Sequence, residues 1–221
     1  MYVHVNAAVS VDGKLSSRRR EQVRISGADD FDRVDRIRAA ADAVLVGVGT
    51  VLADDPHLTI DEADRRVQRL RNARSENPAR VVADSRARTP PDARILDDEA
   101  TTYLLVSDEA DDERLDALRD AGAEILVAGD ADGRVDLTAA FGALEAEGIE
   151  RVMVEGGGEL LFSLFDERLV DELTLYVGSL VIGGREAPTL ADGEGFVDDF
   201  PRLALTDVTR VDDGVLLSYE P

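Results

Sequence analysis

The sequence predicts an α/β fold in which a mostly parallel, mixed sheet lies between two layers of helices. Apolar runs of strand length alternate with segments of helical length along most of the chain. The run AVLVGVGT at 43–50 is continuously apolar until its glycine turn, which is typical of strands that are buried on both faces. The last three strand-like segments follow one another without a helix, so we expect the sheet to close with antiparallel strands.

The first half of the chain begins with a predicted strand over 2–10, because apolar side chains alternate there at Val3, Val5, Ala7 and Val9. After a polar loop, a helix is predicted over 28–42, with aspartates in its first turn and Phe31, Val34 and Ile37 on one side. The strand over 43–50 follows it directly. Residues 53–79 are polar, and we interpret them as a surface excursion.

The second half alternates more regularly. The pattern predicts helices over 111–122, 136–148 and 158–165. It predicts strands over 80–84, 101–107, 124–129, 151–158 and 172–181, and two short ones over 202–208 and 214–220. No linker, low-complexity segment or internal repeat interrupts this order, so residues 1–221 are expected to form one domain.

The charge of the chain excludes several classes of protein. There are 47 acidic and 25 basic residues, which gives a net charge of −22, and Lys14 is the single lysine. This balance argues against binding to nucleic acids or anionic membranes, because both require neutralisation of phosphates. We interpret it as adaptation to a salty cytoplasm, since at about 1 M salt the Debye length is roughly 3 Å and crowded carboxylates hardly repel one another.

Other classes are excluded by what the sequence lacks. The chain has no cysteine, so disulfides, thiolate metal sites and cysteine nucleophiles are ruled out. No apolar run approaches the roughly 18 residues that span a bilayer. The first residues do not form a secretory signal, and the protein is therefore expected in the cytoplasm.

The sharpest local motif is VMVEGGGELLFSLF, in which a buried strand ends at Glu155, three glycines follow and a helix begins. Glycines let the backbone approach a ligand closely, and the helix N-terminus offers free N–H groups to a phosphate. The alternative interpretation is a tight strand-to-helix turn without a ligand. The carboxylate of Glu159 counts slightly against a phosphate at this place.

Two further segments could carry chemistry. In LVGVGTVLADDP, Thr50 could donate to a ligand and Asp54 could act as an acid or base, whereas Asp55 is expected to end a turn or helix before a proline. No third carboxylate or histidine completes a metal shell, so no metal is predicted. In ADSRARTPP, Ser85 and Arg86 could bind a phosphate monoester such as the 2′-phosphate of NADP, or could simply balance surface charge.

Five segments occur in order: NAAVSVDGKLS, RISG, IRAAADAVLVGVGTVLADDPHLT, PARVVADSRARTPPDARIL and VMVEGGGELLFSLFDERLVDELTLYVGSLVIGGREAPTLADGEGF. Together they resemble the riboflavin-biosynthesis reductases, above all the stand-alone archaeal type, over nearly the whole chain. The resemblance implies a dihydrofolate-reductase-like domain, usually a homodimer. It also implies NADPH-dependent reduction of the ribosylamino side chain of 2,5-diamino-6-ribosylamino-4(3H)-pyrimidinone 5′-phosphate to a ribitylamino group. Bacterial relatives carry a fused zinc deaminase, which this cysteine-free chain is expected to lack.

The resemblance also implies roles for individual residues. The cofactor side would include Ala8, Arg24, Thr50, Asp54, Ser85, Gly156, Gly157, Gly158, Glu159 and Leu160. The substrate side would include Gln22, Arg38, Leu58 and Glu155. Glu155 is the first candidate and Asp54 the second for a carboxylate that stabilises an iminium ion or passes a proton, although for Glu155 we favour anchoring of the pyrimidine.

The chain departs from this pattern at Asp61, where bacterial relatives place an arginine. His57 or one of Arg18–Arg20 could supply the missing cation. Three other functions also stay open: reduction of the deaminated 5-amino-6-ribosylamino-uracil phosphate, reduction of a pterin, and nucleotide binding without catalysis.

Overall fold

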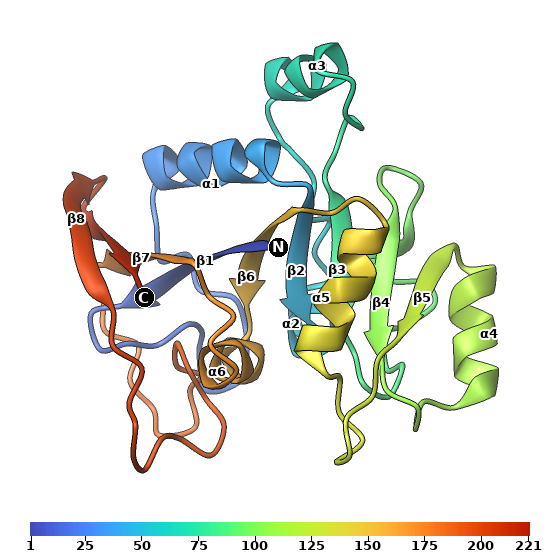
Figure 1. The fold of residues 1–221 in the computed structure, drawn as a ribbon. Coiled ribbons are helices and arrows are strands. Elements are labelled where there is room, and N and C mark those ends of the chain that lie inside the picture. Colours follow the sequence, from blue (N-terminus) through green and yellow to red (C-terminus); the bar gives the residue numbers. More distant parts are fainter. The chain divides into compact units, whose positions relative to one another are not determined.

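The computed structural model describes residues 1–221 (Figure 1). The elements are β1 (Tyr2–Ser10), α1 (Ala28–Ala40), β2 (Ala43–Gly47), α2 (Val48–Asp54), α3 (Ala63–Arg71), β3 (Ala79–Ala83), η1 (Arg94–Leu96), β4 (Thr102–Val106), α4 (Asp112–Asp120), β5 (Ala123–Val127), α5 (Leu137–Ala146), β6 (Arg151–Gly156), α6 (Gly158–Asp166), β7 (Glu172–Gly178), β8 (Ala204–Val211) and β9 (Gly214–Glu220). They form two compact units. The first contains Met1 and Asp35–Met153, and the second contains Tyr2–Val34 and Val154–Pro221.

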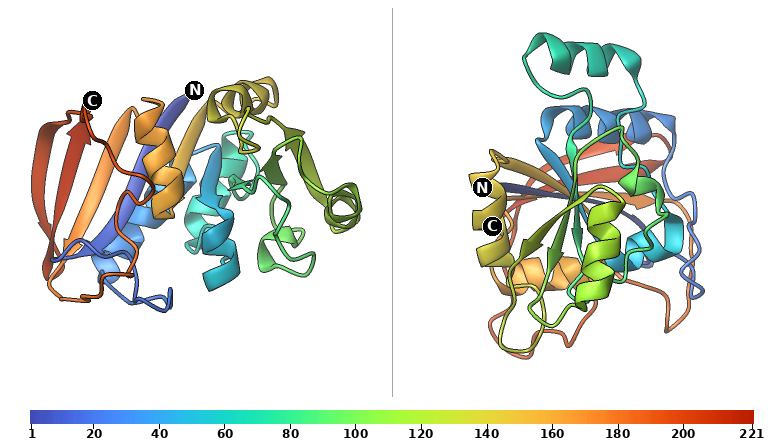
Figure 2. Two further views of the ribbon diagram at one scale, coloured as in Figure 1. Left: turned by 90° about the horizontal axis from the view of Figure 1, so that it is seen from below. Right: turned by 90° about the vertical axis from the view of Figure 1, so that its right-hand side faces the viewer.

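The first unit is built on four parallel strands in the order β5-β4-β3-β2. Side chains on both faces of these strands are buried. In β2, for example, Val44 and Val46 face one side, and Leu45 faces the other. Helices α2 and α5 lie on opposite faces of the strands (Figures 1 and 2). The apolar strands therefore lie between helical layers, as their sequence predicts.

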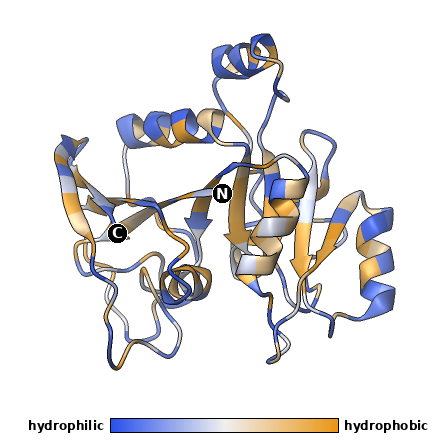
Figure 3. Cartoon of the chain, in the orientation of Figure 1, coloured by the Kyte–Doolittle hydropathy of each residue, from blue (hydrophilic) through white to orange (hydrophobic).

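The second unit contains a mixed sheet. Strand β1 pairs with β7 in parallel, and β9 and β8 follow with antiparallel pairing. Nearly every residue of β8 is exposed, including the apolar side chains of Leu205 and Val208. Figure 3 shows the contrast between the apolar strands of the first unit and the polar surfaces of α1 and α3. The predicted α/β class with a mostly parallel, mixed sheet is confirmed.

One expectation about a single element is wrong, and two further features are not expected from the sequence. The strand predicted over 43–50 ends at Gly47, and α2 begins at Val48. The polar stretch after it contains α3, whose buried Arg69 donates to the carbonyl oxygens of Ala39 and Ala41 at the end of α1. Phe31 does not face the core, because 52% of its surface is exposed. None of the helices has the length and the apolar character that crossing a membrane would require.

Candidate functional site

The glycine turn in the second unit joins β6 to α6. Gly156, the last residue of β6, has φ +123°, which side chains other than hydrogen disfavour, and the Gly156–Gly157 peptide is cis. Gly157 is the N-cap of α6, and no side chain accepts a hydrogen bond from the first turn of that helix. A Cβ atom at Gly156 would meet nothing within 4 Å, so the backbone is open there. The turn thus offers helix N–H groups to an anion without a competing side-chain cap.

The third glycine has a different role from the one the sequence suggests. A Cβ atom on Gly158 would lie 2.5 Å from the carbonyl oxygen of Thr189 and 2.7 Å from Oδ2 of Asp192. The Asp192 N–H donates to the Gly158 carbonyl at 3.0 Å, and Asp192 Oδ1 accepts from the Thr189 hydroxyl at 2.6 Å. Gly158 is therefore required by a loop of the same chain. No local sequence pattern points to Thr189 or Asp192, because their contact spans about thirty residues.

The other candidates of the second unit lie in four places. Glu155 is half-buried on β6, directly before the glycines, and Ala8 is half-buried on β1 opposite Tyr176 of β7. Leu160 is buried in α6, whereas Glu159 is exposed in its first turn. Gln22 is exposed in an irregular segment.

Arg24 is also exposed, and its guanidinium lies 5.6 Å from the ring centroid of Phe31. Its Nε donates to the Ser26 carbonyl oxygen at 3.4 Å. This cation–π contact explains why Phe31 lies outside the core. It also keeps the positive charge of Arg24 at the surface, where an anion could reach it.

In the first unit, Thr50 and Asp54 lie on α2. Thr50 is half-buried near the start of the helix, and Asp54 is its last residue. Although the Asp54 side chain is exposed, desolvation by the surrounding protein raises its pKa. Asp55 is the C-cap with φ 41°, and its Oδ1 accepts from the Arg94 N–H at 2.8 Å. The expected helix-end role of Asp55 is confirmed, and Asp54 is left as the candidate acid.

The residues after α2 approach the end of α1. Leu58 is almost completely buried in an apolar cluster with Val44, Val82 and Ile95. The Thr59 carbonyl accepts from Arg38 at 2.8 Å, so the half-buried Arg38 and the Leu58 segment are held together within the first unit. At the divergent position, the Asp61 N–H donates to Asp35 at 2.6 Å.

The loop after β3 contains three charged residues with different surroundings. Asp84 is fully buried, and its Oδ2 accepts from the N–H and hydroxyl of Thr89 at 2.7 and 2.8 Å. Arg88 Nε lies 3.9 Å from Asp84 Oδ1, whereas Arg86 is exposed. The Ser85 hydroxyl oxygen accepts from the Val135 N–H at 3.1 Å and keeps its own proton available. Of these arginines, Arg86 is the better placed to bind a phosphate.

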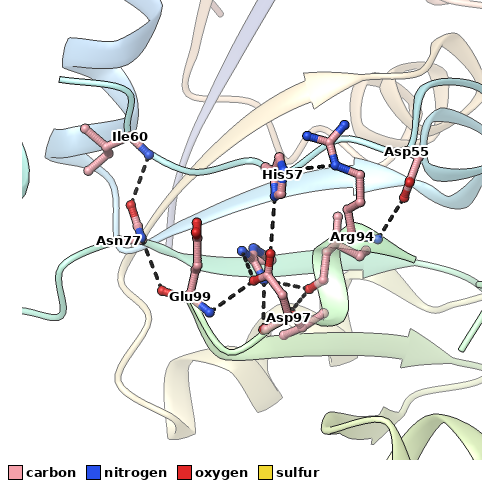
Figure 4. Close-up of polar contacts among 10 residues, drawn as sticks. Asp55, His57, Ile60, Asn77, Arg94, Asp97 and Glu99 are labelled. Carbon is pink, nitrogen blue, oxygen red and sulfur yellow. Dashed lines mark hydrogen bonds and ion pairs between the residues drawn. The ribbon is translucent and has the colours of Figure 1, made fainter. Parts of the chain in front are cut away.

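His57 belongs to a polar network with Arg94 and Asp97 (Figure 4). Arg94 Nε donates to His57 Nε2 at 2.9 Å, so His57 Nδ1 carries the ring proton and donates to Asp97 Oδ2 at 3.2 Å. Ligand atoms of His57, Asp97 and Glu99 lie within 4.8 Å of one another. Because both ring nitrogens of His57 are engaged, this trio does not offer an imidazole ligand to a metal ion.

Comparison with known proteins places these features in context. A family model described as the RibD C-terminal domain matches residues 1–217. The chain is 46% identical over 213 residues to the 2,5-diamino-6-ribosylamino-4(3H)-pyrimidinone 5′-phosphate reductase of Archaeoglobus fulgidus, a match that covers 96% of this chain and 94% of that protein. The protein of the same name from Methanothermobacter thermautotrophicus is 43% identical over 220 residues, covering 99% and 97%.

Solved structures agree with this similarity. A pyrimidine reductase-like protein from Corynebacterium diphtheriae superposes with a TM-score of 0.84 over 99% of this chain and 91% of that chain. Its sequence identity is 22%, so this match shows the fold alone. The expected dihydrofolate-reductase-like fold is confirmed.

Proposed function

The chain belongs to the RibD C-terminal domain family of riboflavin-biosynthesis oxidoreductases, and from this premise we propose that it reduces the ribosylamino side chain of 2,5-diamino-6-ribosylamino-4(3H)-pyrimidinone 5′-phosphate to a ribitylamino group with NADPH. The observation that carries the proposal is the 46% identity, over 96% of the chain, to an archaeal protein of that name. The uncapped start of α6 beside Gly156 supports it, because a phosphate-containing cofactor needs such donors.

The residues present fit NADPH in each unit. The residues that the resemblance assigns to the cofactor side are the glycine turn, Ala8 and Arg24 in the second unit; in the first unit, the resemblance assigns Thr50, Asp54 and Ser85, and the loop sequence adds Arg86. When bound, NADPH supplies a hydride for C1′ of the ring-opened imine of the substrate. Asp54 is the candidate carboxyl for passing a proton to the reduced nitrogen, and desolvation raises its pKa. Glu155 would anchor the pyrimidine, and Arg38, Leu58 and Gln22 would lie on the substrate side.

The choice between NADPH and NADH can be tested at two neighbouring arginines. Arg86→Ala should lower the preference for NADPH over NADH by about tenfold, because a charge-assisted bond to the 2′-phosphate is lost. Arg88→Ala is the matched control, since Arg88 is already close to the Asp84 carboxylate. Steady-state kinetics with both cofactors measure the ratio. An unchanged ratio in Arg86→Ala would mean that the 2′-phosphate is bound elsewhere.

We also propose that the enzyme is a cytoplasmic homodimer and that residues 1–221 form a single reductase domain. Support for the dimer comes from β8, which ends the β7-β9-β8 order and exposes Leu205 and Val208. The cytoplasm is where NADPH and phosphorylated pyrimidines are available. A mass measurement by light scattering in molar KCl tests the dimer, which a monomer at working concentration would contradict.

A further inference from the structure

The 54–60 segment runs from the last residue of α2 towards α3, and its backbone is irregular after Asp54. Asp55 and Leu58 have φ values of 41° and 56°, in the left-handed region that side chains with a Cβ atom disfavour. Such conformations are costly and persist only when surrounding contacts hold them. The 54–60 segment contains Asp54 and Leu58, two residues assigned above to the reaction.

Both ends of the 54–60 segment are tied to the first unit. Near its start, Asp55 Oδ1 accepts from the Arg94 N–H at 2.8 Å. Near its end, the Ile60 N–H donates to Asn77 Oδ1 at 3.0 Å, and Asn77 Nδ2 donates to the Glu99 carbonyl at 3.2 Å. Figure 4 shows that the first tie leads to Arg94 of η1, and that the second leads through Asn77 to Glu99, between η1 and β4.

His57 provides the tie in the middle. Its Nε2 accepts from Arg94 Nε at 2.9 Å, and its Nδ1 donates to Asp97 Oδ2 at 3.2 Å. Asp97 in turn is fixed on its other oxygen, Oδ1, by the fully buried Arg80 at 2.7 Å and by the Glu99 N–H at 3.0 Å. The network therefore connects the 54–60 segment to Arg80, which is fully buried in β3.

Charged groups lie on both sides of the His57 ring. The groups that face it are the guanidinium of Arg94 and the carboxylate of Asp97, with Arg80, Glu99 and Asp55 bonded to them or nearby. Desolvation opposes ionisation of Asp97, but the hydrogen bond from Arg80 and the Glu99 N–H outweigh it and lower the pKa of Asp97.

We propose that His57 is a positioning residue, which holds the 54–60 segment so that Asp54 and the backbone at Leu58 are presented to the phosphorylated pyrimidine. This inference rests on the proposed function. It replaces the expectation that His57 supplies a cation to the substrate, because both ring nitrogens already have protein partners. Arg94 and Asp97 share the role, since each holds one side of the ring.

Two substitutions of His57 separate positioning from general stability. His57→Leu removes both ring hydrogen bonds, whereas the amide nitrogen of His57→Asn can still donate to Asp97 from the place of Nδ1. His57→Leu should raise the KM for the pyrimidine about tenfold, and by more than it raises the KM for NADPH. His57→Asn should restore most of that loss. Asp98→Asn, an exposed neighbour of Asp97, is the control and should change neither constant.

Hydrogen–deuterium exchange of the same variants, without substrate, reads the backbone directly. Amides of residues 55–60 should exchange faster in His57→Leu than in the wild type, His57→Asn or Asp98→Asn. If His57→Leu does not fold, Arg94→Met removes the Nε2 partner and should accelerate the same amides by a smaller amount, because the bond from Nδ1 to Asp97 remains.

Two results would overturn the inference. Unchanged hydrogen exchange together with an unchanged KM for the pyrimidine in His57→Leu would show that His57 does not hold the 54–60 segment in place. An equal rise of that KM in His57→Leu and His57→Asn, with unchanged exchange, would show that His57 touches the substrate itself. A wild-type enzyme that oxidises no NADPH with either pyrimidine phosphate would contradict the proposed function, and the exchange comparison would still decide the role of His57.

Discussion

Glu155 lies near the end of a strand, and the proposed reaction assigns it to anchoring the pyrimidine. It is half-buried at the end of β6, where the next residue already has the glycine-only φ of +123°. Glu155→Gln keeps the shape of the side chain and removes its charge. It should lower kcat/KM for the pyrimidine at least about tenfold, because a buried charged group that anchors substrate is worth more than 1.4 kcal/mol.

The matched control for this substitution is Glu150→Gln, an exposed residue just before β6. Both variants should melt within a few degrees of the wild type, so that the kinetic loss is assigned to the site. Kinetics close to wild type for Glu155→Gln at saturating salt would remove Glu155 from the site.

Among the helices and strands, those with an apolar run or stripe are predicted from the sequence. An element that is held in place by polar contacts is missed. The strands β2 to β4 and the helices α4 to α6 are found within a few residues, because each has an apolar run or stripe. Helix α3 has no such stripe: its apolar residues Val67 and Leu70 are exposed, and Arg69 holds it in place through carbonyl groups. Such bonds leave no local pattern to read.

The candidate site shows the same division. Residue types and glycine spacing identify Glu155, the glycine turn and Asp54. They do not identify Asp97 as the partner of His57, forty positions away, or Asp192 as the neighbour of Gly158. Long-range partners of this kind depend on how the chain folds back, and a single sequence does not contain that information in its periodicity.

The glycine turn allows a prediction on α6. Gly158→Ala places a Cβ atom 2.5 Å from the Thr189 carbonyl, so the loop or the helix must shift. We expect a lower melting temperature and weaker NADPH binding, measured by calorimetry. The control is Gly142→Ala in the exposed middle of α5, where nothing lies within 4 Å of the new Cβ. That change should stabilise by about 0.5–1 kcal/mol. Equal effects of both variants would contradict the close packing at Gly158.

At the scale of the whole molecule, the net charge of −22 opposes both anionic ligands of the proposed reaction. Many arginines are engaged by carboxylates or carbonyl groups, as Arg80, Arg69 and Arg65 are, which leaves few positive charges for ligands. The exposed Arg86 is therefore of particular value to NADPH binding. Salt screens the remaining repulsion.

This charge also predicts how stability depends on salt. The free energy of unfolding, measured with uncharged urea, should rise steadily from low to molar KCl, because the Debye length falls from tens of ångströms to roughly 3 Å. Sucrose at equal osmotic pressure is the control and should have a smaller effect. Stability that is flat or falls with KCl would contradict adaptation to salt.

The measurement that tests the central claim most directly is NADPH oxidation by the pure enzyme in molar KCl, followed by absorbance. The two substrates to compare are 2,5-diamino-6-ribosylamino-4(3H)-pyrimidinone 5′-phosphate and its deaminated uracil counterpart, with dihydrofolate as a third. We predict rapid oxidation with the diamino compound and much slower oxidation with the other two. Oxidation with none of them would indicate a nucleotide-binding protein without catalysis, and faster oxidation with the uracil compound or dihydrofolate would contradict the proposed substrate.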